Sequence, residues 1–170
     1  MTVRSRQKML DRMKHAAMLD VHTYEEVEAD TTATRQAAGV VVLAAIAQGI
    51  GAAGEGGPGI VAGIIVALIA WLVWAGVTYL IGDKLLGGTA TWGELLRTLG
   101  FAQTPALLAV FAILPLVGGV IRLAITVWVL IAGIVAIRQA LDFSTGKAVL
   151  TAVIGWLALA IPAALFGMGG

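Results

Sequence analysis

The sequence predicts an all-α fold: a polytopic membrane helix bundle of five transmembrane helices with an N-terminal cytoplasmic amphipathic helix. Three observations carry this prediction. Hydrophobic residues make up 59% of the 170 residues and charged residues only 12%, whereas soluble domains are about 45–50% apolar. The mean hydropathy is +0.96. The apolar residues also form long runs, and Lys and Arg residues fall between these runs in a repeating pattern.

The positions of the cations predict the topology. Ten of the eleven Lys and Arg residues lie before the first apolar run or in every second gap between runs: Arg4, Arg6, Lys8, Arg12, Lys14, Arg35, Lys84, Arg97, Arg138 and Lys147. Arg122 alone lies on the other side. Because cationic loops stay in the cytoplasm during insertion, this alternation predicts five crossings, a cytoplasmic N-terminus and a periplasmic or extracellular C-terminus.

Residues 1–33 are predicted to form a cytoplasmic helical segment that precedes the membrane domain at 34–170. Within residues 4–20, a helix would place one set of side chains on an apolar face, namely Met9, Leu10, Met13, Ala16 and Ala17, and another on a basic face, namely Arg4, Lys8, Arg12 and His15. Such a helix fits two arrangements. It either lies in the plane of the lipid headgroups or packs, solvated, on the cytoplasmic ends of the spans.

A second helix is predicted directly before the first span. Thr23 and Glu26 have the spacing of a capping box, which predicts a helix start at Thr23. Acidic residues then follow from Glu25 to Asp30, where negative charge favours the start of a helix. The sequence allows this helix to run unbroken into the first span. The first 20 residues contain no apolar run of the kind found in a cleaved leader, so none is expected.

Five spans are predicted, at about 36–53, 59–81, 95–114, 121–140 and 148–166. Gly54 to Pro58 and Pro115 to Gly119 are the predicted external turns. A second capping box, Thr91 with Glu94, precedes the third span. Pro105 lacks a backbone donor, so we expect a kink near residues 101–105 and a carbonyl near Phe101 that needs another partner.

Residues for membrane-embedded chemistry are scarce. The two serines, Ser5 and Ser144, lie outside the predicted spans, and both histidines, His15 and His22, precede the first span. There is no Cys. This pattern predicts no catalytic dyad, no metal site and no bound cofactor. The cations flank membrane spans rather than forming one basic face, so no nucleic acid is expected as a partner.

Several residues are candidates for helix packing or for the membrane interface. Small or helix-breaking residues are the packing candidates: Gly59, Gly63, Gly100, Gln103, Pro105, Gly133 and Gly155. The interfacial candidates are Met9, Leu10, Met13, Ala17, Trp92 and Arg122. Arg122 lies near the outer end of span four, where it can snorkel to the headgroups, make a structural hydrogen bond, or serve a ligand or ion.

Three segments resemble the bacterial branch of the Yip1 family. The first is the glycine-bearing connection with Leu86-Gly87-Gly88 that leads to Leu95-Leu96-Arg97-Thr98-Leu99-Gly100-Phe101-Ala102-Gln103-Thr104-Pro105. The second runs from Val127-Trp128 to Ala148, and the third is Tyr24 to Ala37. Together the resemblance covers roughly residues 17 to 165, and it implies five spans with a cytoplasmic N-terminus in the bacterial inner membrane. The chain lacks the tyrosine-rich form associated with Rab-type partners in eukaryotic members, so the resemblance does not imply a Rab-like partner.

These observations predict a non-enzymatic integral membrane protein that acts by binding other membrane proteins or lipids, in the form of a homo- or hetero-oligomer within the lipid bilayer. An accessory subunit of a larger bioenergetic complex is a variant of this hypothesis. The alternative is a small transporter or channel, with a site at the kinked third span around Gly100 and Gln103. The spans contain no acidic residue to couple ions, which favours the first hypothesis.

Overall fold

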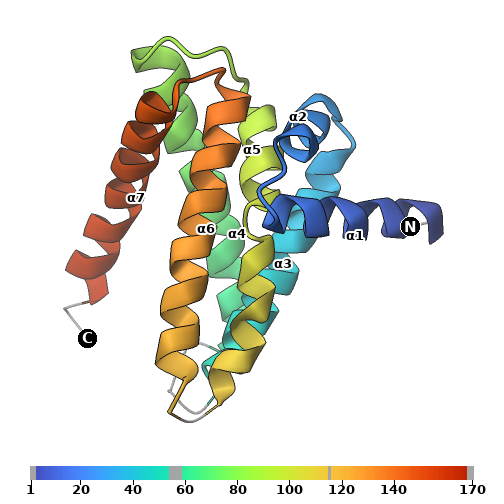
Figure 1. The fold of residues 1–170 in the computed structure, drawn as a ribbon. Helices are drawn as coiled ribbons and strands as arrows, with labels where there is room; N and C mark the ends of the chain where they lie inside the picture. The colour runs from blue at the N-terminus through green and yellow to red at the C-terminus, as the bar shows by residue number, and fades with distance from the viewer. Residues whose placement is uncertain (1–2, 54–58, 115, 168–170) are drawn as a thin grey trace.

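The protein folds into a bundle of long helices crossed by a separate N-terminal helix (Figure 1). This is a computed structural model, and it describes residues 3–53, 59–114 and 116–167. The α-helices in that part of the chain are α1 (Val3–Ala17), α2 (Val21–Ala29), α3 (Ala33–Gly51), α4 (Gly59–Tyr79), α5 (Trp92–Phe101), α6 (Gly118–Ala140) and α7 (Thr145–Gly167). A π-helical segment, η1 (Leu80–Leu85), extends α4, and a 3-10 helix, η2 (Thr104–Ile113), follows α5.

The bundle confirms the predicted all-α membrane class. Four stretches of the described chain are long and apolar enough to cross a membrane, at Ala33–Gly51, Gly59–Leu85, Trp92–Ile113 and Gly118–Ala140. Helix α7 adds a shorter apolar stretch at Thr145–Gly155. The chain is therefore a multi-pass membrane protein. The second span is longer than predicted, because η1 carries the helix from Tyr79 on to Leu85.

The predicted kink in the third span is confirmed, and it is a full change of helix type. Helix α5 ends at Phe101, and the chain continues as the 3-10 helix η2 with Pro105 in its first turn, where a missing N–H costs nothing. The carbonyl that Pro105 leaves without a helical donor is satisfied locally, because Thr104 Oγ1 donates to Phe101 O at 2.7 Å. The predicted capping box of Thr91 and Glu94 is also present at the start of α5.

Two predictions for the segment before the first span are wrong. Helix α2 is capped by Asp20, whose carboxylate accepts the backbone N–H of His22 at 3.2 Å, and not by Thr23. Thr23 instead donates to Asp20, while Glu26 turns towards α1. The helix also does not continue into the first span. Asp30 ends α2 and accepts from the backbone and hydroxyl of Thr32, because a short acidic side chain satisfies a turn more readily than a helix interior.

Residues Val3 to Asp30, which comprise α1 and α2, are called the polar head below. Helix α2 lies at the end of the bundle where α5 begins, and α1 runs crosswise over the long helices about midway along the bundle (Figure 1). The main core forms where α3, α5 and α6 meet beneath the polar head, and its fully buried side chains include Val40, Leu95, Leu99 and Ile137. We call the end that carries α2 the head end and the opposite one the far end.

Candidate functional site

The polar head is held to the bundle by a buried arginine. Arg12 of α1 is 3% exposed, and its guanidinium donates to Glu26 at 2.8 Å, to Asp30 at 2.6 Å and to Gln36 of α3 at 3.0 Å. Lys8 adds a solvent-exposed ion pair to Glu26 at 3.1 Å. A buried charge is tolerated only when it is paired and hydrogen-bonded, and Arg12 is both. The Arg12 guanidinium lowers the pKa of Glu26.

A second buried arginine binds the same C-terminal end of α2 from the third span. Arg97 of α5 is 6% exposed, and its Nε donates to the carbonyl oxygens of Val27 at 3.0 Å and Glu28 at 2.9 Å. A further bond joins its terminal nitrogen to the Glu28 carbonyl. The last carbonyls of a helix have no helical donor and carry partial negative charge, so a cation is favoured there. Arg97 thereby ties the third span to the polar head.

The C-terminus of α1 is fixed by two aromatic donors. Tyr24 of α2 donates its hydroxyl to Ala16 O at 3.0 Å, and Trp128 of α6 donates its indole N–H to Ala17 O at 2.8 Å. Leu19 then adopts a left-handed conformation with φ of 63°, which turns the chain into α2. The end of α1 is thus joined both to α2 and to the middle of α6.

The predicted amphipathic face of α1 packs mostly on protein. Met9, Met13 and Ala16 are buried in the main core, so this side of the helix packs on the spans. Leu10 is 54% exposed, so it lies off that face, and Ala17 is half-buried. The expectation that Arg12 belongs to the exposed basic face is wrong, because the carboxylates of α2 provide a partner that helical periodicity within α1 does not reveal.

Acidic side chains gather around Arg97 where α2, α5 and the α6–α7 connection meet. Burial, and then the nearby carboxylates of Glu94 and Asp142, raise the pKa of Glu28 to about 7, and Arg97 opposes this shift. Asp30 behaves in the opposite way: hydrogen bonds from Thr32 and Arg12 lower its pKa to about 2. Within the described part of the chain, no group of His, Cys, Asp and Glu side chains is arranged to hold a metal ion.

Three of the predicted packing glycines lie at close helix contacts. A Cβ on Gly100 would lie 2.6 Å from the Cβ of Ala37, so α3 and α5 touch there. A Cβ on Gly133 would lie 2.9 Å from the Trp74 ring, and one on Gly155 would lie 3.3 Å from Trp74 Nε1. The Trp74 side chain of α4 therefore occupies the space left by glycines of α6 and α7.

The other packing candidates behave differently. A Cβ on Gly59 or Gly63 would meet nothing within 4 Å, so these two residues make no close contact among the described residues. Pro105 is buried and Gln103 is half-buried at the break in the third span. Sequence reasoning missed Gly51, where a Cβ would lie 2.0 Å from the Ala109 carbonyl of η2. The run of small residues at the end of α3 was the available signal.

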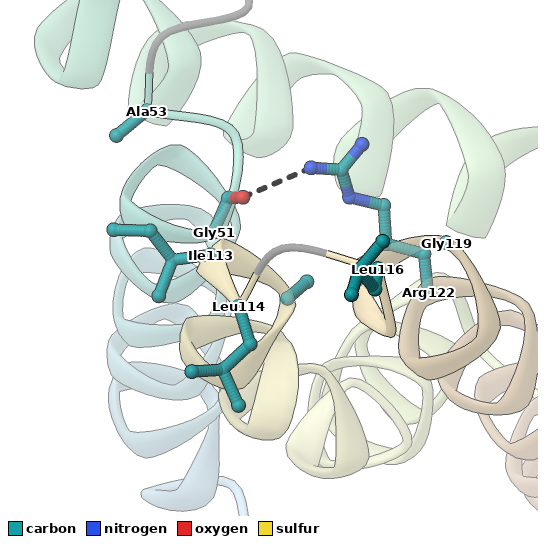
Figure 2. Close-up of a pocket in the computed structure, with 9 residues that line it drawn as sticks. Gly51, Ala53, Ile113, Leu114, Leu116, Gly119 and Arg122 are labelled. Atoms are coloured by element: carbon teal, nitrogen blue, oxygen red, sulfur yellow. Dashed lines mark hydrogen bonds between the residues drawn. The ribbon is translucent and has the colours of Figure 1, made fainter.

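The interfacial candidates at the two ends also differ. Trp92 is 46% exposed at the first position of α5, near the head end. Arg122 lies at the far end and donates to Gly51 O at 2.9 Å, so it makes a structural hydrogen bond (Figure 2). It lines a cavity of about 260 Å³ together with residues of α3, η2 and the α6 start, including Ala53, Ile113 and Gly119.

Of the cations, sequence reasoning missed the roles of Arg12 and Arg97. The sequence pattern places both among the membrane-flanking charges. In the structure each is buried and bonds to groups more than ten residues away along the chain. The only signal was the acidic run from Glu25 to Asp30, which offers a counter-charge close in sequence to the first span.

One comparison with known proteins gave a match. The family model described as Yip1 domain matches residues 23–167, most of the chain. No curated protein and no solved structure matches.

Proposed function

The chain belongs to the Yip1 domain family, and we propose that it serves as a membrane scaffold that binds other integral membrane proteins or lipids through its polar head. Members of this family are generally non-enzymatic membrane proteins. The proposal includes a bacterial inner-membrane location, with the head in the cytoplasm and the C-terminus in the periplasm. The positions of ten of the eleven cations support this orientation.

The observation that carries the proposal is the double attachment of the polar head. Arg12 joins α1, α2 and α3, and Arg97 joins α2 to α5 through backbone carbonyls, so two buried guanidinium groups hold the head. A hydrogen bond that involves a charged group contributes about 1.5–3 kcal/mol, so these bonds together keep the head in a fixed orientation on the bundle. A rigid polar surface at the end of an apolar bundle is suited to binding a partner, because little conformational entropy is lost on association.

Transport through the broken third span has less support. Phe101 and Ala102 are fully buried at the break, and the Thr104 hydroxyl is used by the carbonyl of Phe101. Broken helices that bind substrates present freed backbone groups to a cavity. Here the freed carbonyl of Phe101 already accepts a hydrogen bond from Thr104 within the third span. A flux assay in liposomes that responds to Gln103→Leu would promote the transporter over the scaffold.

Affinity purification from gently solubilised membranes tests the scaffold. The wild type should retain a partner protein or a specific lipid class, identified by mass spectrometry. Arg12→Gln should lose that partner, because the head is released. Arg35→Gln removes the same charge from an exposed position nearby and should retain it. Co-migration with a coloured or haem-containing complex on a native gel would identify an accessory subunit. A lone monomer with no partner and no specific lipid overturns the proposal.

A further inference from the structure

The exposed apolar surface has different heights on two sides of the bundle. On the second span the large exposed apolar side chains run from Ile60 to Leu80, which is roughly 30 Å at about 1.5 Å per residue, before the ion pair of the exposed Lys84 with Asp83. On α6 the large exposed apolar side chains run from Val120 to Ile131, which is roughly 17 Å. Beyond Ile131, α6 exposes Arg138, and Gln139 bonds to Glu25 of the polar head at 3.1 Å.

Helix α1 lies where the apolar surface of α6 ends. Trp128, which donates to the last carbonyl of α1, lies twelve residues before the end of α6 at Ala140, so it is roughly 18 Å below the head end. On α3, the space beside Gly39 is filled by the sulfur of Met9, 4.0 Å from where a Cβ would stand. Both contacts put α1 about midway along the bundle, as Figure 1 shows.

The outward side of α1 is charged and cannot lie in hydrocarbon. Arg6, Asp11 and Lys14 are exposed there. Each charged side chain at the bilayer centre costs about 2.5–3.5 kcal/mol. Leu10 is 54% exposed and Met18 is 67% exposed on the same helix. Cations beside exposed apolar side chains are typical of a helix that lies among lipid headgroups, with its apolar groups in the upper acyl chains.

We propose that α1 lies at the headgroup level of the inner leaflet, and that the bilayer beside α1 is consequently much thinner than the bilayer beside α4. The apolar height left below α1 is roughly half of a hydrocarbon core of about 30 Å. The ligand of this surface is anionic phospholipid, which Arg6 and Lys14 attract. The protein would thus act as a wedge that thins and bends one leaflet. This inference rests on the proposed function only in taking lipid as a partner of the head.

The depth of two matched positions tests the inference. Trp74 packs on Gly133, so these residues lie at the same height on α4 and α6. Leu72 and Ile131 each lie two residues before them, and they are 40% and 42% exposed. Because the chain has no native Cys, Leu72→Cys and Ile131→Cys each give a single spin label in the full-length protein. The measured quantity is the accessibility of each spin label to collision with oxygen and with a water-soluble nickel chelate. The protein is reconstituted in phosphatidylcholine vesicles that contain phosphatidylglycerol.

We expect the ratio of oxygen to nickel accessibility to be several-fold higher at Leu72→Cys than at Ile131→Cys. Releasing the helix with Arg12→Gln should move the Ile131→Cys label deeper, towards the Leu72→Cys value. Equal depths at the two positions in the wild-type background would overturn the inference. So would an Ile131→Cys label shielded from both reagents, since protein rather than lipid would then cover this side. Neither result affects partner capture in the purification experiment, so the two proposals can fail separately.

Discussion

The two sides of this bundle differ in the buried polar groups that they contain and in how these groups are paired. On the side of α1 and α3, the buried guanidinium groups of Arg12 and Arg97 are fully engaged with carboxylates and carbonyls. On the side of α4 and α7, Trp74 Nε1 and Thr78 Oγ1 are buried with no hydrogen-bond partner in the described part of the chain. The side of α1 and α3 therefore adds buried cations to its glycine contacts, whereas the side of α4 and α7 has glycines that receive a large aromatic side chain.

This difference separates two ways of holding helices together in a membrane. Between helices surrounded by lipid, close packing at small residues supplies most of the attraction, and no counter-charge is available. Beneath the polar head, acidic side chains come within reach, and a cation can be buried without remaining unpaired. Close packing thus holds helices together on both sides of the bundle, and buried cations add to it only beneath the polar head, so only that side should respond to the loss of a charge.

The largest expected effect is at Arg12. Arg12→Ala leaves Gln36 and the partly exposed carboxylates of Glu26 and Asp30 without their buried donor, and losing hydrogen bonds to a charged group costs about 1.5–3 kcal/mol. Lys8→Ala is the matched control, because Lys8 pairs with the same two carboxylates from an exposed position and should cost about 0–1 kcal/mol. Limited proteolysis of the polar head in membranes measures both. Similar cleavage rates in the two variants would show that the buried Arg12 does not hold the polar head on the bundle.

The next effect compares two glycines. Gly100→Ala brings a Cβ to 2.6 Å from the Cβ of Ala37, and such overpacking costs about 1–3 kcal/mol. Gly63→Ala meets nothing within 4 Å and should stabilise helix α4 by about 0.5–1 kcal/mol, because glycine disfavours a helix interior. Thermal unfolding in detergent should therefore show shifts of opposite sign. Shifts of the same sign would show that backbone propensity outweighs packing at Gly100.

Two buried threonines sharpen the contrast in pairing. Thr78 and Thr98 are both fully buried, but only Thr98 donates, to Glu94 O at 3.0 Å. Thr98→Val should destabilise the protein by about 1 kcal/mol, whereas Thr78→Val should be neutral or stabilising, since it removes an unpaired hydroxyl. The same unfolding assay checks both. A loss at Thr78 as large as that at Thr98 would mean that its hydroxyl has a partner in the membrane.

The smallest effect is a pH dependence of head docking. The pKa of Glu28 rises to about 7 in the folded protein, so the folded state binds more protons than the unfolded state between the ordinary carboxyl pKa and about 7. Docking should weaken as pH rises through that window. The pKa of Asp30 is lowered to about 2, so its contribution is lost only in strong acid.

Glu28→Gln separates these two contributions. The variant should abolish the weakening towards neutral pH while keeping the acid loss due to Asp30. Protease sensitivity of the head, measured from acid to neutral pH in both proteins, checks this. An unchanged profile in Glu28→Gln would assign the dependence to another group.

Much of this fold could be predicted because membrane insertion depends on features local in sequence. Apolar length identified the crossing helices, the spacing of Thr91 and Glu94 identified a helix start, and Pro105 identified the break in the third span. Each of these signals acts within a few residues. The glycine contacts of Gly100 and Gly133 were also among the predictions, although the sequence did not reveal what fills the space beside them.

The docking of the polar head on the bundle could not be predicted, because its contacts join residues that are distant in the sequence. Arg97 bonds to carbonyls 69 and 70 positions earlier, and Trp128 bonds to a carbonyl 111 positions earlier. Backbone carbonyls are present at every residue, so no side-chain pattern marks them as acceptors. The Thr23 capping box failed for a related reason: Asp20 is an equally good cap, and Glu26 gains more from the buried guanidinium of Arg12.

The most direct test is whether helix α1 of the polar head is docked midway along the bundle in a native membrane. In the protein, which has no native Cys, Met9→Cys with Gly39→Cys joins two neighbouring positions, because the Met9 sulfur lies 4.0 Å from where a Gly39 Cβ would stand. A short bifunctional thiol reagent should give an intramolecular linked peptide, detected by mass spectrometry. Leu10→Cys with Gly39→Cys is the control, because Leu10 is exposed. Docking of α1 against α3 predicts efficient linkage in the first pair and little in the second. Equal yields, or no linkage in the first pair, would contradict it.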